Sequence, residues 1–421
     1  MNTETESTVQ RHWKEILLTR KMLVCIFLGF TSGLPLYVLI QLVPAWLRSS
    51  EVDLATIGLF SLVSLPYTWK FVWSPLMDRF RPPFLGRRRG WALITQVALL
   101  VSIGVMGSFD PTESLQGIVV LVFLVSLFSA SQDIVVDAYR RELLADDELG
   151  TGNSFAINAY RVSSLVPGAL SLILADHMPW SSVFWITAAF MGVGIVTTLV
   201  IKEVSDDSLA PHTLKAALIE PFREFFSRGG VGPALAILAF MVLYKLGDNM
   251  AVALETPFYI DMGYSLTEIG SVAKVAKLWS SIAGGILGGI LMLKLSINRA
   301  LWIFGFVQMA TILGYAWLSV VDHNLTALFA MVSAEYLGVG LGAIALTAFI
   351  ARETSLGFTA TQFALFSSLF AIPRVLANAS TGFIIEAIGY TSFFVLCTSL
   401  AIPGMLMLFK VAPWSGNTRS G

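Results

Sequence analysis

The stretch MLVCIFLGFTSGLPLYVLIQLVPAW, residues 22–46, decides the fold, because it holds 25 consecutive residues without a charged side chain. A helix of about 20 apolar residues crosses the hydrocarbon core of a bilayer. A strand of a membrane barrel is about ten residues long and alternates apolar with polar side chains, and this stretch does not alternate. It therefore predicts a membrane-spanning helix. No small-residue cleavage site follows it, so we expect an uncleaved anchor.

Eleven further runs of similar length and composition follow along the chain. The repeated pattern predicts an all-α membrane protein with twelve transmembrane helices. The predicted spans are 22–46, 56–77, 91–109, 117–139, 154–176, 182–202, 232–260, 266–293, 300–320, 325–350, 359–386 and 390–410.

The composition of the whole chain agrees with this class. Of the 421 residues, 56% are hydrophobic and only 13% are charged. Soluble domains carry about 25% charged residues, so an ordinary soluble enzyme is excluded. The net charge of −1 provides no basic surface for nucleic acid. Cys25 and Cys397 lie in separate apolar runs and indicate neither a disulfide framework nor a metal site.

The distribution of basic residues predicts the orientation. If the N-terminus is cytoplasmic, 20 of the 27 Lys and Arg residues fall in inner segments, six fall within spans, and Arg48 alone falls in an outer loop. Lys and Arg favour the cytoplasmic side of a membrane. We therefore expect a multi-pass protein with both termini in the cytoplasm.

A polar stretch at 203–231 separates two halves, which we predict to be six-helix bundles at 1–202 and 232–421 joined by a cytoplasmic linker. LATIG at 54–58 is similar to LTEIG at 266–270, an offset of 212 residues, at matching places in the predicted topology. Two related six-helix halves are typical of the major facilitator fold, in which substrate binds between the halves near the middle of the membrane.

Eleven ionisable side chains lie inside the predicted spans. Each charge costs roughly 2.5–3.5 kcal/mol at the bilayer centre. We therefore expect these side chains to line a shared hydrated interior rather than to face lipid. They are Lys70, Asp133, Asp137, Arg161, Lys245, Asp248, Glu255, Lys274, Lys277, Glu335 and Arg374.

Lys70, Asp133 and Arg161 fall at one depth in the first half, roughly 10–12 Å above the inner surface at 1.5 Å per residue. Asp137 lies one turn nearer the edge, where Arg141 is an alternative partner. One interpretation is a static set of ion pairs that holds the helices in register. The other is proton coupling, in which a carboxylate that loses its cation to the substrate takes up a proton. The candidate coupling carboxylates are Asp133, Asp137, Asp248 and Glu335.

The intramembrane cations outnumber the carboxylates by six to five, which favours an anionic or zwitterionic substrate. Glu255 and Lys274 lie nearer the outer mouth, where a gating pair is the expected role. Amides and aromatic rings near the other charges suit a sugar-containing ligand, although the rings also fit core packing or an interfacial belt. The candidate substrate-binding residues are Tyr37, Gln41, Lys70, Gln132, Arg161, Lys245, Asn249, Arg374 and Asn378.

Two glycine-rich patterns lie within spans. Gly284, Gly285, Gly288 and Gly289 form a stripe of small residues that permits close helix packing. GVGLG at 338–342 has no strand before it, so we exclude a nucleotide-binding loop.

The loop after the second span carries SPLMDR at 74–79 and GRRRG at 86–90. It resembles the loop signature of major facilitator transporters, with Ser74 where glycine is usual. That resemblance implies a conformational lock, and Asp78, Arg79 and Arg141 are the candidate gating residues.

Five longer strings carry a more specific resemblance. They are FTSGLPL (30–36), YTWKFVWSPLMDR (67–79), LGRRRGW (85–91), SQDIVVDAYRREL (131–143) and GDNMAVALETPFY (247–259). With them the chain resembles the AmpG muropeptide permease family. The resemblance implies proton-driven import of anhydromuropeptides across a Gram-negative inner membrane, for cell-wall recycling and beta-lactamase induction, with protons as coupling ion and no other cofactor. We expect a monomer in the lipid bilayer.

Other functions remain open at this point. Acetyl-CoA transporters resemble the same strings, so an acetyl-CoA or other organic-anion transporter is the alternative. A membrane-embedded enzyme is disfavoured, because His12, His177, His212 and His323 all fall in tails or loops. A channel is disfavoured because charges spread through two repeats suit alternating access.

Overall fold

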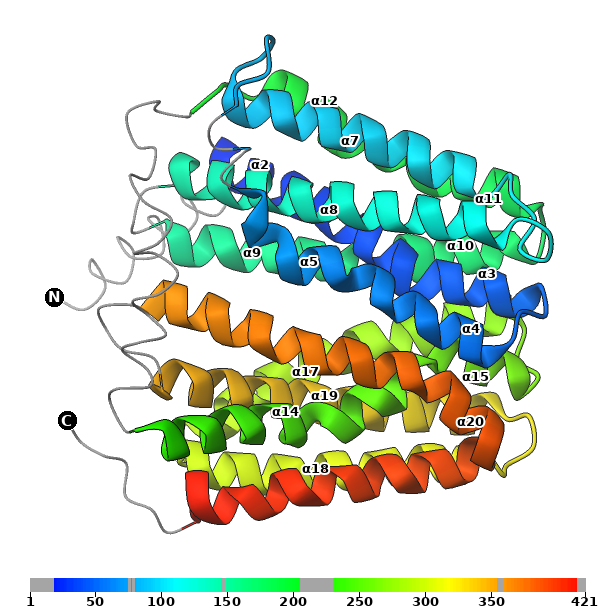
Figure 1. Ribbon diagram of the computed structural model, residues 1–421, viewed down its shortest axis with the longest axis vertical. Coiled ribbons are helices and arrows are strands. Elements are labelled where there is room, and N and C mark those ends of the chain that lie inside the picture. The colour runs from blue at the N-terminus through cyan, green and yellow to red at the C-terminus, as the bar shows by residue number, and fades with distance from the viewer. Residues whose placement is uncertain are drawn as a thin grey trace, which may run out of the picture. The chain divides into compact units, whose positions relative to one another are not determined.

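Every element in the described part of the chain is helical (Figure 1). The computed structural model describes residues 19–74, 77, 80–144, 148–204, 230–353 and 359–414. Contacts group the chain into two units, Met1–Trp46 with Trp69–Ala210, and Leu47–Thr68 with Pro211–Gly421. The predicted division at 203–231 stays a prediction, because most of that linker lies outside the described residues.

The first membrane-crossing helix shows how the local sequence shapes an element. Thr19 accepts a hydrogen bond from the backbone N–H of Met22 and caps the N-terminus of α2 (Arg20–Tyr37). Pro35 lies inside α2 and is followed by a wider turn, η1 (Val38–Leu42). Proline has no N–H and clashes with the preceding turn, so local widening is the expected adjustment.

The first unit is completed by helices that pack in antiparallel pairs, such as α7 beside α8 (Figure 1). Its remaining elements are α3 (Val43–Ser49, whose last residues belong to the second unit), η3 (Lys70–Val72), α7 (Arg87–Met106), α8 (Leu115–Leu143), α9 (Leu149–Val162), η4 (Val166–Leu170), α10 (Ser171–Ala175), α11 (Trp180–Ala189) and α12 (Gly192–Val200).

The second unit packs around buried Phe240, Phe304, Phe349 and Leu408. Its elements are α4 (Leu54–Leu59), η2 (Phe60–Ser64), α5 (Leu65–Trp69, whose last residue belongs to the first unit), α14 (Val231–Ala253), α15 (Glu255–Asp261), α16 (Leu266–Glu268), η6 (Ile269–Ala273), α17 (Lys274–Met292), α18 (Ile297–Leu318), α19 (Leu325–Glu353) and α20 (Thr359–Val411).

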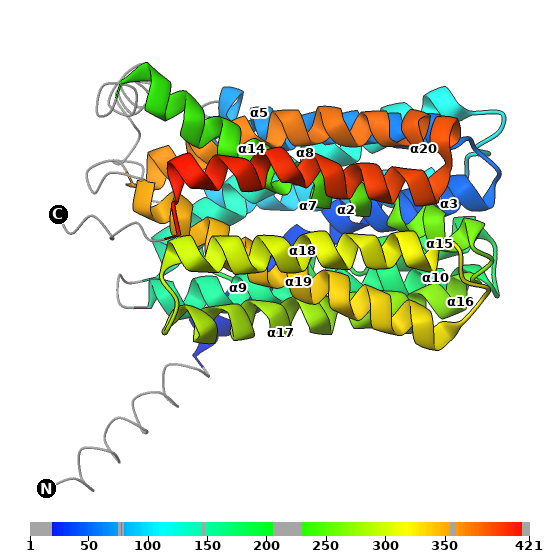
Figure 2. The same ribbon diagram turned by 90° about the horizontal axis from the view of Figure 1, so that it is seen from below.

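Ten described helices are long and apolar enough to cross a membrane, so the predicted count of twelve is not confirmed. The predicted span 56–77 is broken into short segments, and its apolar helix covers only Leu54–Trp69. The last two predicted spans correspond to two helices within α20. They meet at Gly389, where the chain reverses direction with a φ of 75° that suits glycine, and the second of them runs beside α18 (Figures 1 and 2).

Arg48, the one cation predicted for an outer loop, is held within the second unit. Its Nε donates to Asp261 Oδ1 at 2.6 Å, and the Tyr390 hydroxyl donates to Asp261 Oδ2 at 2.6 Å. Nearby, the backbone N–H of Ala55 donates to Glu386 at 3.0 Å. These contacts attach the end of α3 to α15, the start of α4 to α20 before its reversal, and α15 to α20 after it.

The predicted glycine stripe has two different sides. A Cβ atom added at Gly284 would overlap the carbonyl oxygen of Leu337 on α19, whereas one added at Gly285 would have no heavy atom within 4 Å. From α19, Gly340 approaches the backbone of α17 equally closely. GVGLG therefore serves helix packing, as glycines do in membrane interfaces.

We expect Gly284→Ala to lower the stability of the protein in detergent by about 1–3 kcal/mol, because the methyl group must push α17 away from α19. Gly285→Ala is the matched control and should leave stability unchanged or slightly raised. Thermal unfolding of the purified variants measures both, and equal melting temperatures for the two would contradict the packing assignment.

Candidate functional site

The first unit contains a polar cavity of about 340 Å³ between α2, α8 and α9. Four of its lining residues are charged, and three of them, Asp133, Asp137 and Arg161, lie within predicted spans. The cavity is lined by Gly29, Ser32, Tyr37, Asp133, Asp137, Arg140, Ala156, Ile157, Tyr160 and Arg161.

Asp133 lies on the wall of this cavity, with its side chain 13% exposed. The Ser32 hydroxyl on α2 donates a hydrogen bond to its Oδ1, and Lys70 Nζ lies 3.9 Å from its Oδ2. At that distance the lysine balances the charge without a direct hydrogen bond. The structure thus places Lys70 beside Asp133, which agrees with the prediction that both lie at one depth in the membrane.

Arg161 lies in the last turn of α9 and lines the same cavity. No carboxylate of the described residues lies within ion-pair distance of it, so the static Asp133–Arg161 pair does not form in this part of the chain. The rings of Tyr37 and Tyr160 meet edge to face beside it, with centroids 5.8 Å apart. The cavity therefore offers an arginine cation next to two aromatic rings.

Asp137 is one turn from Asp133 on the same face of α8, with its side chain 55% exposed. It accepts a hydrogen bond from Arg140 at 2.8 Å, so its observed partner is the residue before the predicted Arg141. Gln41 and Gln132 are buried and do not line the cavity. Both side-chain polar atoms of Gln132 lack a hydrogen-bond partner among the described residues.

A second group of charges lies inside the second unit. Lys245 Nζ donates to Asp248 Oδ2 at 2.5 Å, and both side chains are less than 10% exposed. Glu335 on α19 is fully buried near Asp248, Thr311 and Lys245. Neither Glu335 oxygen makes a hydrogen bond of good geometry within the described part of the chain. Lys245 therefore pairs with Asp248, and Glu335 lies near that pair without a direct contact to the lysine.

A third group surrounds Glu255 at the start of α15. Lys274 and Lys277 both donate to its Oε1, at 2.9 and 2.6 Å, and the Tyr336 hydroxyl donates to its Oε2 at 2.5 Å. Lys274 also donates to the Thr256 hydroxyl at 2.6 Å. The predicted Glu255–Lys274 pair forms, but sequence reasoning missed Tyr336 and Thr256, which carry no recognisable pattern.

For the remaining predicted site residues the structure gives only their burial or their place on a helix. Asn249 on α14 and Asn378 on α20 are half-buried. Arg141 lies in the last turn of α8. Asp78, Arg79 and the side chain of Arg374 lie outside the described residues.

The arginines of the GRRRG segment are attached to their own unit. Arg88 Nη2 donates to Glu142 at 2.7 Å, and Glu203 accepts the backbone N–H groups of Arg88 and Arg89 at 3.3 and 3.0 Å. A carboxylate at a helix N-terminus is stabilised by the helix dipole. The sequence did not single out Glu142 or Glu203 as partners.

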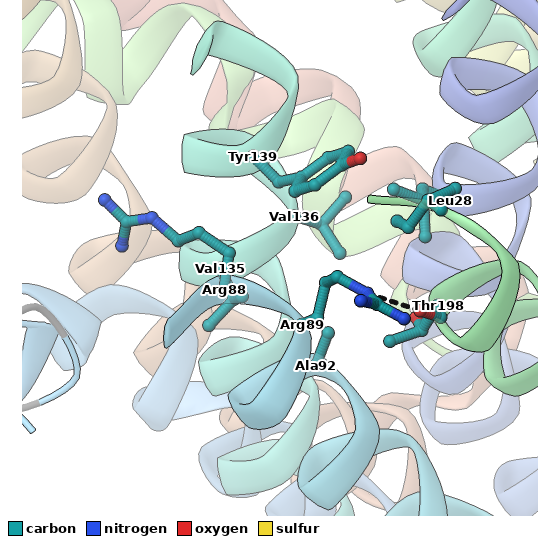
Figure 3. A pocket seen from close by; sticks show the side chains of 9 residues that line it. Leu28, Arg88, Arg89, Ala92, Val135, Val136, Tyr139 and Thr198 are labelled. Atoms are coloured by element: carbon teal, nitrogen blue, oxygen red, sulfur yellow. Dashed lines mark hydrogen bonds between the residues drawn. The ribbon is translucent and has the colours of Figure 1, made fainter. Parts of the chain in front are cut away.

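Figure 3 shows the neighbouring contacts, with Arg89 directed toward Thr198 and Arg88 pointing away from it. Arg89 Nε donates to the Thr198 carbonyl at 2.9 Å, and the Tyr139 hydroxyl donates to the Lys202 carbonyl at 2.8 Å. The cavity among these residues is only about 10 Å³, which is too small for a substrate. These arginines therefore anchor α7 to α8 and α12.

Solved structures with the same fold are transporters. The nucleoside transporter NupG matches with a TM-score of 0.71 at 11% identity, covering 95% of this chain and 100% of its own. A D-xylose-proton symporter matches with a TM-score of 0.72 at 12% identity, covering 94% and 98%. The Major Facilitator Superfamily profile matches residues 23–378. The chain is therefore a membrane transporter of the major facilitator fold.

Sequence relatives define the family within that class. The anhydromuropeptide permease of Escherichia coli K12 is 42% identical, over 91% of this chain and 78% of its own. A Haemophilus influenzae protein is 49% identical, over 94% and 96%. The chain belongs to the AmpG-type anhydromuropeptide permease family of the Major Facilitator Superfamily.

The buried Lys245–Asp248 pair gives a prediction about the free energy of unfolding. We expect Lys245→Gln to destabilise the protein by about 3–5 kcal/mol, because it leaves Asp248 buried without its cation. Glu335→Gln should cost little, since it removes a carboxyl group that the lysine does not hold. Thermal unfolding in detergent measures the difference, and a Glu335→Gln variant as unstable as Lys245→Gln would show that Glu335 carries a structural charge.

Proposed function

We propose that this protein is a proton-coupled symporter that imports peptidoglycan-derived anhydromuropeptides from the periplasm to the cytoplasm across the inner membrane. The identity to the Escherichia coli permease supports the substrate class. The observation that carries the mechanism is Asp133, a half-buried carboxylate on a cavity wall with one loosely held cation, Lys70.

Substrate binding and protonation are linked through that cation. A carboxylate of the incoming substrate competes with Asp133 for Lys70, which has 36% of its side chain exposed. Once its cation is engaged elsewhere, Asp133 keeps the Ser32 hydroxyl but is a largely buried charge without a counter-ion, and its neutral protonated form becomes the favoured one. Release of the substrate on the inner side returns Lys70 to Asp133 and expels the proton.

The chemistry of the cavity suits the proposed substrate. Anhydromuropeptides combine sugar rings, amides and free carboxylates. Arg161 is available for a carboxylate, and the rings of Tyr37 and Tyr160 provide surfaces for sugar stacking. In the second unit, the buried Glu335 near the Lys245–Asp248 pair is a second place where a proton can be held.

This transport activity places the protein in cell-wall recycling and in the induction of beta-lactamase. An acetyl-CoA transporter or another organic-anion transporter is the alternative, since an available arginine also suits those ligands. Uptake of labelled anhydromuropeptide into membrane vesicles, with and without excess acetyl-CoA, separates the two. Saturable muropeptide uptake that acetyl-CoA does not inhibit supports the proposal. The absence of muropeptide uptake overturns it.

Asp133→Asn should abolish accumulation of labelled muropeptide driven by a proton gradient, because the amide cannot take up the coupling proton. Exchange of labelled for unlabelled substrate across the membrane should persist, since it needs no net proton movement. Asp110→Asn, at an exposed loop position, is the control. Undiminished accumulation by Asp133→Asn would remove Asp133 from the coupling role.

Arg161→Ala should raise the KM for muropeptide by about tenfold or more, as expected for loss of a charge-assisted contact. Arg161→Lys keeps the charge and should recover part of the affinity. Initial uptake rates over a range of substrate concentrations give both values. An unchanged KM for Arg161→Ala would assign Arg161 to helix packing.

A further inference from the structure

We infer that Lys277 and Lys274 form a carboxylate-binding subsite in the second unit, with Glu255 as the resident anion that a substrate carboxylate joins. The inference rests on the proposed function, because the ligand it names is the stem peptide of an anhydromuropeptide. It adds a subsite in α15 and α17, apart from the cavity that contains Asp133.

The charges around Glu255 do not balance. Lys274 and Lys277 both donate to the same oxygen, Glu255 Oε1, and the second oxygen accepts the neutral Tyr336 hydroxyl. No second carboxylate among the described residues pairs with either lysine. A buried group with two ammonium ions and one carboxylate carries an excess positive charge, which is costly in a low-dielectric interior. A ligand carboxylate removes that cost.

The two lysines differ in accessibility. The Lys274 side chain is 2% exposed, and its ammonium donates to both Glu255 and Thr256. The Lys277 side chain is 22% exposed and makes one hydrogen bond, to Glu255. An ammonium group has three donors, so Lys277 keeps donors for a ligand. Lys274 therefore holds Glu255 in place, and Lys277 is the contact residue.

The surroundings of Lys277 allow it to bind a ligand carboxylate while Glu255 stays in place. Lys277 Nζ lies 4.5 Å from the centre of the Tyr336 ring, so the ring fixes one side of the ammonium by a cation–π contact. The Tyr336 hydroxyl already holds the other oxygen of Glu255. A ligand carboxylate that reaches Lys277 shares the cation with Glu255 and needs no rearrangement of Lys274.

The test compares two ligands, a muropeptide with free stem carboxylates and the same molecule with those carboxylates amidated. In vesicles, Lys277→Gln should raise the KM for the free acid by about tenfold or more and the KM for the amide by less than threefold. Lys277→Arg keeps a cation and should restore much of the preference for the acid. Equal effects on both ligands, or no effect on either, would overturn the subsite.

A binding measurement separates this inference from the proposed function. The free stem peptide and its amide are added to the detergent-purified protein, and the melting temperature is followed. We expect the acid to stabilise the wild type more than the amide does, and Lys277→Gln to abolish that difference. Lys274→Gln, which removes the buried lysine, should lower the melting temperature without ligand. If wild-type vesicles take up no muropeptide, the proposed function fails, and an unchanged acid preference in Lys277→Gln overturns the subsite.

Discussion

Burial of charge is the constraint on which the rest of this structure depends. A counter-ion stabilises an ionised side chain inside an apolar helix bundle. For most of the charges in the described residues each unit supplies one from another element or from the next turn of the same helix, with Arg161 and Glu335 as exceptions. Lys70 faces Asp133 across two elements, whereas Lys245 and Asp248 share one helix. Each ion pair restricts the rotation of the helices that carry it. The same contacts therefore determine how the helices of each unit pack and where their charged groups lie.

The same constraint explains why the polar groups differ in character. Asp133 has a loosely held cation and faces a cavity, so its charge can be exchanged with that of a ligand. Glu255 is held by two lysines and a tyrosine hydroxyl, so it is a fixed anion around which cations are arranged. The proposed binding of ligand and proton uses the first type of site, and the proposed positioning of the ligand uses the second.

Much of this organisation could be predicted from the sequence. Long uncharged runs gave the helices, and the constant helical rise placed Lys70 and Asp133 at one depth. The break in the second span was not predicted, because the composition of 56–77 does not show where the helix gives way to the short segments η2 and η3, although Pro66 and Lys70 lie in it. The reversal at Gly389 falls in the gap between the last two predicted spans, whereas its backbone angles could not be read from the composition.

Side-chain partners were the hardest part to predict. Ser32 and Tyr336 are ordinary residues in membrane helices, and only the fold directs their hydroxyls at carboxylates.

The most direct test of the central claim is the internal pH of lightly buffered proteoliposomes when anhydromuropeptide is added outside without an imposed gradient. The account predicts that the interior becomes more acidic as substrate enters. Substrate entry with no change of internal pH would contradict it.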